Sequence, residues 1–277
     1  MGPAMFQINV KRTRARTAFG MLELIYHVAV RSIRKSHGNA IYGLAINIFQ
    51  TVLLISVFYF MMTFLGMRSN AVRGDFVLYL MSGIFLYMTH TKAMGAVMGS
   101  ESSTSAIMKH APMNTIVAIM GAALGALYLQ MLSLIVVLYV YHIVWGPISI
   151  EDPIGAMEML LLSWMSGIAI GTCFLAMKPW SPEFATVGQT VYSRINMIAS
   201  GKMFLANTLP PKMRNFFDWN PLFHTIDQAR GDVFVNYVPH FSSATYPLYV
   251  TLVFLVIGLM AEFYTRQHAS ASWMASK

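Results

Sequence analysis

Long runs of apolar residues, separated by short polar segments, dominate the chain. The first run, residues 41–65, contains no charged residue. At about 1.5 Å of rise per residue, roughly twenty such residues cross the hydrocarbon core of a bilayer as a helix. The pattern recurs along the chain and predicts six membrane-spanning helices. They cover residues 41–65, 76–99, 115–145, 154–177, 184–206 and 247–264.

Before the first span, polar and apolar residues of the segment 19–35 recur at steps of three to four positions. This periodicity predicts an amphipathic helix that lies in the headgroup plane of the membrane. Its basic residues Arg31, Arg34 and Lys35 would face water and lipid phosphate. Residues 1–40 are therefore expected to form a cytoplasmic basic tail followed by an interface helix.

Two longer segments between the spans also have distinct compositions. Residues 100–114 are rich in Ser and Thr and contain Pro112, which predicts a short cytoplasmic helix. Residues 207–246 are too aromatic for an exposed loop, so one or two short helices in a re-entrant segment on the outer side are expected. With a polar cytoplasmic tail at 265–277, the predicted fold is an all-α polytopic membrane protein whose residues 41–264 form one transmembrane domain.

Composition supports this class and sets the orientation. Hydrophobic residues make up 56% of the chain and charged residues 11%, whereas a soluble domain has about a quarter charged residues. The net charge of +8 is concentrated before the first span, which predicts that both termini are cytoplasmic. No nucleic-acid-binding signature accompanies these charges, so attraction to anionic lipid is the better interpretation. The apolar run at 41–65 is too long and too late for a cleavable signal peptide.

Charged residues inside the predicted spans are candidate functional residues, because burying a charge in the bilayer costs at least about 2.5 kcal/mol. Glu158 and Lys202 lie at matching depths and are predicted to form a structural ion pair. Lys92 and Arg194 have no acid at their level. They either line a path for an anionic substrate, together with Tyr87 and His90, or extend toward the inner membrane surface.

Small residues four positions apart are expected to let helices pack closely. They are Gly95 and Gly99, Gly121 and Gly125, and Gly167 and Gly171.

The sequence contains no recognisable catalytic set. It has no HExxH motif, no serine nucleophile elbow and no phosphate-binding G-x-x-x-x-G-K-[ST] loop, and its one cysteine, Cys173, lies in an apolar run. The chain is therefore predicted not to be an enzyme and to bind no metal or cofactor of its own.

Three segments resemble one family. RSIRKSHGNAIYGLAINIFQTVLLISVFYF (31–60) is similar to the entry into the first span of ATP-driven polysaccharide export permeases, and IMKHAPMN (107–114) is similar to their coupling helix. WNPLFHTIDQARGDVFVNY (219–237) resembles their outer-side motif, in a form closer to the capsule branch than to the O-antigen branch. On this resemblance the motif residues are Asn220, Pro221, His224, Asp227 and Arg230, and the residues that contact the ATPase are Ser103, Ile107, Met108, Lys109 and His110.

The resemblance implies an exporter of capsular or other cell-surface polysaccharide, attached to lipid, in the bacterial inner membrane. Two copies of the chain would pair with a separate cytoplasmic subunit that hydrolyses ATP, and a periplasmic co-polymerase and an outer-membrane channel would complete the route. Two alternatives stay open. The cargo of the same machinery could be a drug or a lipid, or the chain could be an ion-driven carrier, for which the sequence shows no inverted repeat.

Overall fold

A computed structural model describes residues 14–37, 39–64, 66, 75–100 and 114–268, and the regular secondary structure of these residues is entirely helical. The long helices closely follow the predicted apolar runs. The helices are α1 (Arg14–His37), α2 (Ala40–Phe64), α3 (Phe76–Met98), α4 (Thr115–Val144), α5 (Pro153–Met177), α6 (Pro182–Ala199), α7 (Pro211–Arg214), α8 (Pro221–Val233) and α9 (Thr245–His268), with a 3₁₀ turn, η2, at Ala206–Thr208.

Helix starts are set by local chemistry. Asp75, Asp152, Ser181 and Asn220 each accept a hydrogen bond from a backbone N–H of the first turn that follows. These side chains satisfy donors that have no partner within the helix. A proline at the first helical position follows the last three of these caps, where its missing N–H costs nothing.

Four helices of the described part of the chain are long and apolar enough to cross a membrane, namely α2, α4, α5 and α9. The second and fifth predicted spans, α3 and α6, are not among them. α3 contains the polar run from Thr89 to Lys92. The helix predicted over 184–206 ends at Ala199, because Gly201 turns the chain with a φ of +72°.

α5 is the central helix of the bundle. Within its most apolar stretch 67% of residues are buried, against 22% for α2 and α9 and 28% for α4. α5 packs most extensively against α3 and α9. The approach to α3 needs glycine, because a Cβ at Gly167 would lie 2.4 Å from the carbonyl oxygen of His90, and one at Gly171 would lie 2.8 Å from that of Met94. The packing role predicted for this glycine pair is confirmed.

A second glycine pair brings α1 against α4. A Cβ at Gly121 would lie 2.5 Å from a methyl carbon of Val28, and one at Gly125 would lie 3.1 Å from the carbonyl oxygen of Ala29. α1 therefore packs on the bundle through residues such as Val28 and Ala29. At Arg14–His37 it is also longer than the predicted segment 19–35.

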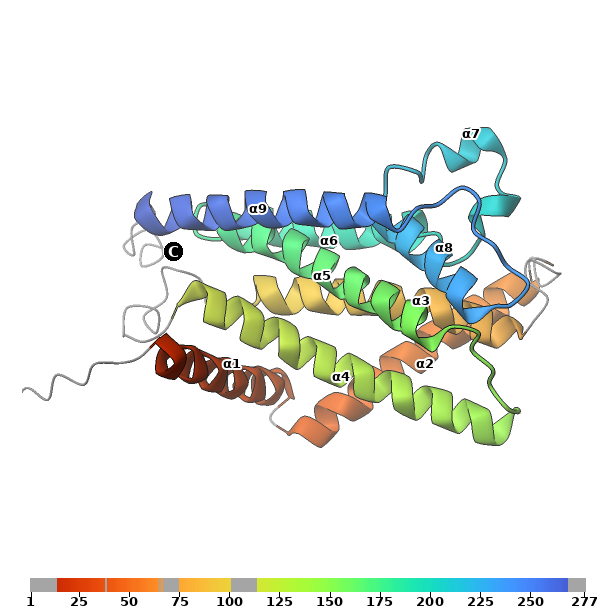
Figure 1. Cartoon of the computed structure of the whole chain (residues 1–277), viewed down its shortest axis with the longest axis horizontal. Coiled ribbons are helices and arrows are strands. Elements are labelled where there is room, and N and C mark those ends of the chain that lie inside the picture. Colours follow the sequence, from red (N-terminus) through yellow and green to blue (C-terminus); the bar gives the residue numbers. More distant parts are fainter. Residues whose placement is uncertain (1–13, 38, 65, 67–74, 101–113, 269–277) are drawn as a thin grey trace, which may run out of the picture.

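The helices begin and end near two opposite ends of the molecule (Figure 1). The start of α1, the end of α3, the start of α4 and the end of α9 lie at one end. α7 and α8 lie at the opposite end, where α8 packs against α5 and α3. The short helices expected within 207–246 are therefore present as α7 and α8, and α8 is largely buried.

Candidate functional site

A buried polar cluster lies on one face of α8. His224, Asp227 and Arg230 are spaced three residues apart and are all buried, with Asn220 capping the start of the helix. A spacing of three places side chains on neighbouring positions of one helical face. The structure thus brings together the outer-motif residues that the sequence resemblance singled out.

Arg230 holds the chain segment that follows α6. One guanidinium nitrogen, Nη1, donates to the carbonyl oxygens of Gly201 at 2.9 Å and Phe204 at 2.7 Å. The other, Nη2, donates to the carbonyl oxygen of Lys202 at 2.7 Å. The guanidinium carbon lies 4.2 Å from the centre of the Tyr79 ring on α3. The planar fork of arginine therefore satisfies three carbonyls in a segment without helical bonds.

Asp227 joins the segments on both sides of α8. Its Oδ1 accepts from the backbone N–H of Ala206 at 3.1 Å and from the Tyr237 hydroxyl at 2.5 Å, and its Oδ2 accepts from the Ser242 hydroxyl at 2.7 Å. Burial, and then the charge of Asp227, raise the pKa of the Tyr237 phenol. The phenol therefore stays protonated and donates to the carboxylate.

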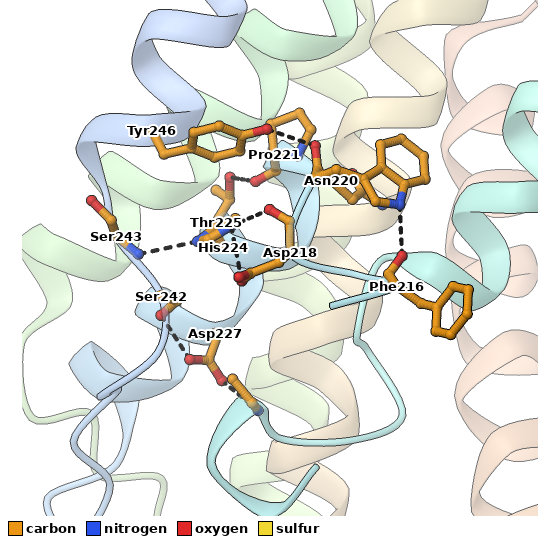
Figure 2. A network of polar contacts seen from close by, with 12 residues as sticks. Phe216, Asp218, Asn220, Pro221, His224, Thr225, Asp227, Ser242, Ser243 and Tyr246 are labelled. Carbon is orange, nitrogen blue, oxygen red and sulfur yellow. Dashed lines mark hydrogen bonds and ion pairs between the residues drawn. The ribbon is translucent and has the colours of Figure 1, made fainter. Parts of the chain in front are cut away.

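His224 holds the segment before α9 (Figure 2). The backbone N–H of Ser243 donates to its Nδ1 at 3.2 Å, so this nitrogen is the acceptor and the ring proton lies on Nε2. Nε2 lies 2.7 Å from the carbonyl oxygen of Asp218, to which it donates. The ring also packs against Tyr246, with 4.8 Å between centroids. His224, Asp227 and Arg230 thus hold the segments around α8, although the Nε atom of Arg230 is buried without a hydrogen-bond partner.

Lys202 does not form the predicted ion pair with Glu158, so this prediction is wrong. Lys202 is 1% exposed, and its ammonium lies 3.4 Å from the centre of the Tyr87 ring and 4.9 Å from that of Phe58. No described residue accepts a hydrogen bond from its Nζ atom. The turn at Gly201 directs this side chain toward α2 and α3, where aromatic faces stabilise the cation.

Glu158 instead lies exposed on α5, beside other carboxylates. The pKa of Asp232 at the end of α8 is raised first by burial and then by the charges of Asp152 and Glu158. Matching depth along two helices was therefore insufficient to pair Lys202 with Glu158, because the two side chains point to different surroundings.

The residues proposed to line a substrate path occupy different environments. His90 is fully buried, with Nδ1 2.8 Å from the Ser166 hydroxyl and Nε2 3.1 Å from that of Tyr192. His90 thus forms hydrogen bonds with residues of α5 and α6. Tyr87 donates its hydroxyl to the carbonyl oxygen of Ser193 at 3.2 Å.

Lys92 and Arg194 are also separate. Lys92 donates to Gln50 on α2 and lines a cavity between α1, α2, α3 and α4. Arg194 is exposed on α6 and does not line that cavity. The structure does not gather Lys92, Arg194, Tyr87 and His90 into a single site.

The remaining predicted residues lie on α1 or outside the described residues. Arg31 and Arg34 are exposed on α1, and the helix includes Lys35. The ATPase-contact residues fall in 101–113, outside the described residues. They are Ser103, Ile107, Met108, Lys109 and His110.

Sequence reasoning missed a polar contact where α2 crosses α4. The amide nitrogen of Asn47 donates to the Ser133 hydroxyl at 2.9 Å, the Gln130 side-chain oxygen at 3.2 Å and the carbonyl oxygen of Leu129 at 3.3 Å. The only available signal was an amide inside an apolar run, which predicts an interhelical hydrogen bond but not its partner.

No group of His, Cys, Asp and Glu side chains among the described residues is arranged to hold a metal ion. No protein-family model matches this chain, and no curated protein sequence is significantly similar to it.

Proposed function

We propose that this chain is the permease subunit of an ATP-driven exporter of cell-surface polysaccharide, of the capsular type, in the bacterial inner membrane. Two copies would assemble with two copies of a separate cytoplasmic ATPase, because the chain contains no phosphate-binding loop of its own. The cargo would be an acidic glycan attached to a lipid, passed on to a periplasmic co-polymerase and an outer-membrane channel.

The observation that most supports this proposal is the position of the helix ends. The described chain begins with α1 and finishes with α9 at the same end of the molecule, and α3 ends and α4 begins there as well. The basic N-terminal block and the coupling segment 101–113 are joined to these ends. An exporter that receives force from a cytoplasmic ATPase needs these parts on one side of the membrane.

In this proposal α3 and α6 complete a set of six crossings with α2, α4, α5 and α9. Sixteen residues of α3 are buried, including Thr89 and His90. Polar residues of a spanning helix are tolerated when they face protein and not lipid. The low hydropathy of α3 is therefore compatible with a crossing inside the bundle.

The same reasoning supports a re-entrant outer segment at 207–246. Non-helical backbone is tolerated at membrane depth only where protein satisfies its polar groups. Arg230 and Asp227 supply such partners to the segment between α6 and α8. We infer that α8 and its flanking segments form the outer part of the translocation unit.

The proposal is tested by purifying the tagged chain from native membranes in mild detergent and identifying co-purifying proteins by mass spectrometry. We expect an ATPase subunit in about equal molar amount, and ATPase activity in the purified complex. The tagged chain carrying Met108→Asp and Lys109→Asp serves as a matched control and should recover much less ATPase. Recovery of the intact chain with no ATPase would contradict the proposal and favour an ion-driven carrier.

A further inference from the structure

A cavity with a volume of about 390 Å³ lies between α1, α2, α3 and α4. Gly99, just after the end of α3, lines it, so the cavity reaches toward the end of the molecule at which α3 ends. Ligand cavities in proteins are typically about 300–1,000 Å³. Small residues form much of its wall, among them Gly95, Ala96 and Gly125.

Lys92 gives this cavity its charge. It is the one charged side chain among the described residues that line the cavity, and none of them is acidic. Its ammonium group has three donors, of which the bond to the Gln50 side-chain oxygen uses one. Among the other polar lining groups, the Thr91 hydroxyl donates to the carbonyl oxygen of Tyr87 at 2.9 Å, and the Asn47 amide nitrogen donates to groups of α4. The two remaining N–H donors of Lys92 are thus available to a ligand, and their positive charge favours an anion.

The walls leave room beside this lysine. Glycine and alanine make up six of the thirteen lining positions, so little side-chain volume enters the space. Two exposed arginines of α1, Arg31 and Arg34, flank the lining residues Ser32 and Ile33 along the chain. Their positive charge would raise the local concentration of anions near the cavity.

The surroundings of the cavity distinguish a lipid from a soluble anion. Next to the lining residues of α2, Ile41 is 76% exposed and Phe49 is 66% exposed. Large apolar side chains with such exposure on an apolar helix are expected to contact acyl chains. The cavity therefore presents a cation beside a lipid-facing apolar surface.

We propose that the cavity between α1 and α4 binds the phosphate group of an anionic membrane lipid. The phosphate lies against Lys92, and the acyl chains extend along the exposed face of α2. This inference rests only on the embedding of the apolar helices in a membrane. If the chain is also an exporter, the cavity is the place where the lipid anchor of the cargo is held.

The test uses the purified, delipidated full-length chain titrated with phosphatidylglycerol or phosphatidylcholine of identical acyl chains, with bound lipid counted by native mass spectrometry. We expect tighter binding of phosphatidylglycerol. Lys92→Gln should weaken it about tenfold, which corresponds to about 1.4 kcal/mol, and Lys92→Arg should retain it. Arg266→Gln, which removes an exposed charge near the end of α9, is the matched control and should leave binding unchanged.

A second variant tests the cavity itself. Ala96→Leu keeps the lysine but fills part of the space, and it should also weaken phosphatidylglycerol binding while its elution profile and melting temperature stay close to those of the wild type. Equal binding of both lipids by the wild type, or unchanged binding in Lys92→Gln, would overturn the proposal.

Excess inorganic phosphate provides the remaining arm of the experiment. We expect that it does not displace phosphatidylglycerol. Displacement by phosphate alone would identify a site for the free ion and would overturn the lipid assignment. Because these measurements need no ATPase, their failure is distinguishable from a failure of the proposed exporter function, which the pull-down tests separately.

Discussion

Replacement of Arg230 should reveal how much the buried α8 motif contributes to the folded state. The Arg230 side chain is 0% exposed and donates three hydrogen bonds to carbonyls of the segment 201–204. In Arg230→Lys the positive charge remains, but a compact ammonium cannot reproduce the geometry of the fork. We expect two of the three bonds to be lost.

The magnitude follows from the nature of these bonds. A hydrogen bond to a charged group contributes about 1.5–3 kcal/mol, so losing two of them lowers the free energy of unfolding by about 3–6 kcal/mol. For chains of roughly this size the melting temperature changes by about 2–4 °C per kcal/mol. A decrease on the order of 10 °C is therefore expected.

The assay is thermal unfolding of the purified chain in one detergent, followed by tryptophan fluorescence and by size-exclusion elution of heated samples. Arg266→Lys is the matched control, because Arg266 is exposed on α9 and makes none of these contacts. Arg230→Met, which removes the charge as well, should be at least as destabilised as Arg230→Lys. If Arg230→Lys melted within about 2 °C of the wild type, well below the expected shift, the carbonyl bonds would not be what holds this segment.

Three further predictions address packing, pH and coupling. Gly167→Ala should lower the melting temperature because its Cβ would collide with a carbonyl of α3, whereas Gly20→Ala, which meets nothing within 4 Å, should leave it equal or slightly higher; equal effects would contradict the packing argument. Asp232→Asn should raise the melting temperature at neutral pH, since burial and nearby carboxylates raise the pKa of this carboxyl in the folded state. That stabilisation of the protonated form is lost as pH rises through the folded pKa, so the advantage of the variant should shrink toward about pH 4; an advantage independent of pH would refute this origin. Met108→Asp with Lys109→Asp should abolish polysaccharide export in cells while membrane insertion, measured by immunoblot of membrane fractions, is unchanged; normal export by this variant would argue against the proposed ATPase contact.

Local features of the sequence were sufficient to predict where most of the long helices lie. The apolar runs predicted α2 through α5 to within about two residues, because hydrophobicity and N-terminal caps act over neighbouring positions. The fifth run was predicted too long. Gly201 ends it early by adopting a positive φ, and apolar composition alone does not register such a turn.

The candidate site was predicted only in part. The α8 residues His224, Asp227 and Arg230 were singled out by the resemblance of residues 219–237 to a family motif, and the structure unites them on one face. Their role could not be read from the pattern, because their partners lie in segments such as 201–206 and 237–243, which only the folded chain brings to α8.

The sequence by itself determined that this is a helical chain with segments long and apolar enough to span a membrane, where most of its long helices lie, and that the pairs Gly121/Gly125 and Gly167/Gly171 permit close packing. Each of these depends on composition within one or two helical turns. Only the tertiary structure decided that Lys202 lies against Tyr87 and not beside Glu158, and that Lys92 and His90 have different surroundings. Such choices depend on how each helix is rotated about its axis and which neighbour it meets, and these are set by the packing of the whole bundle.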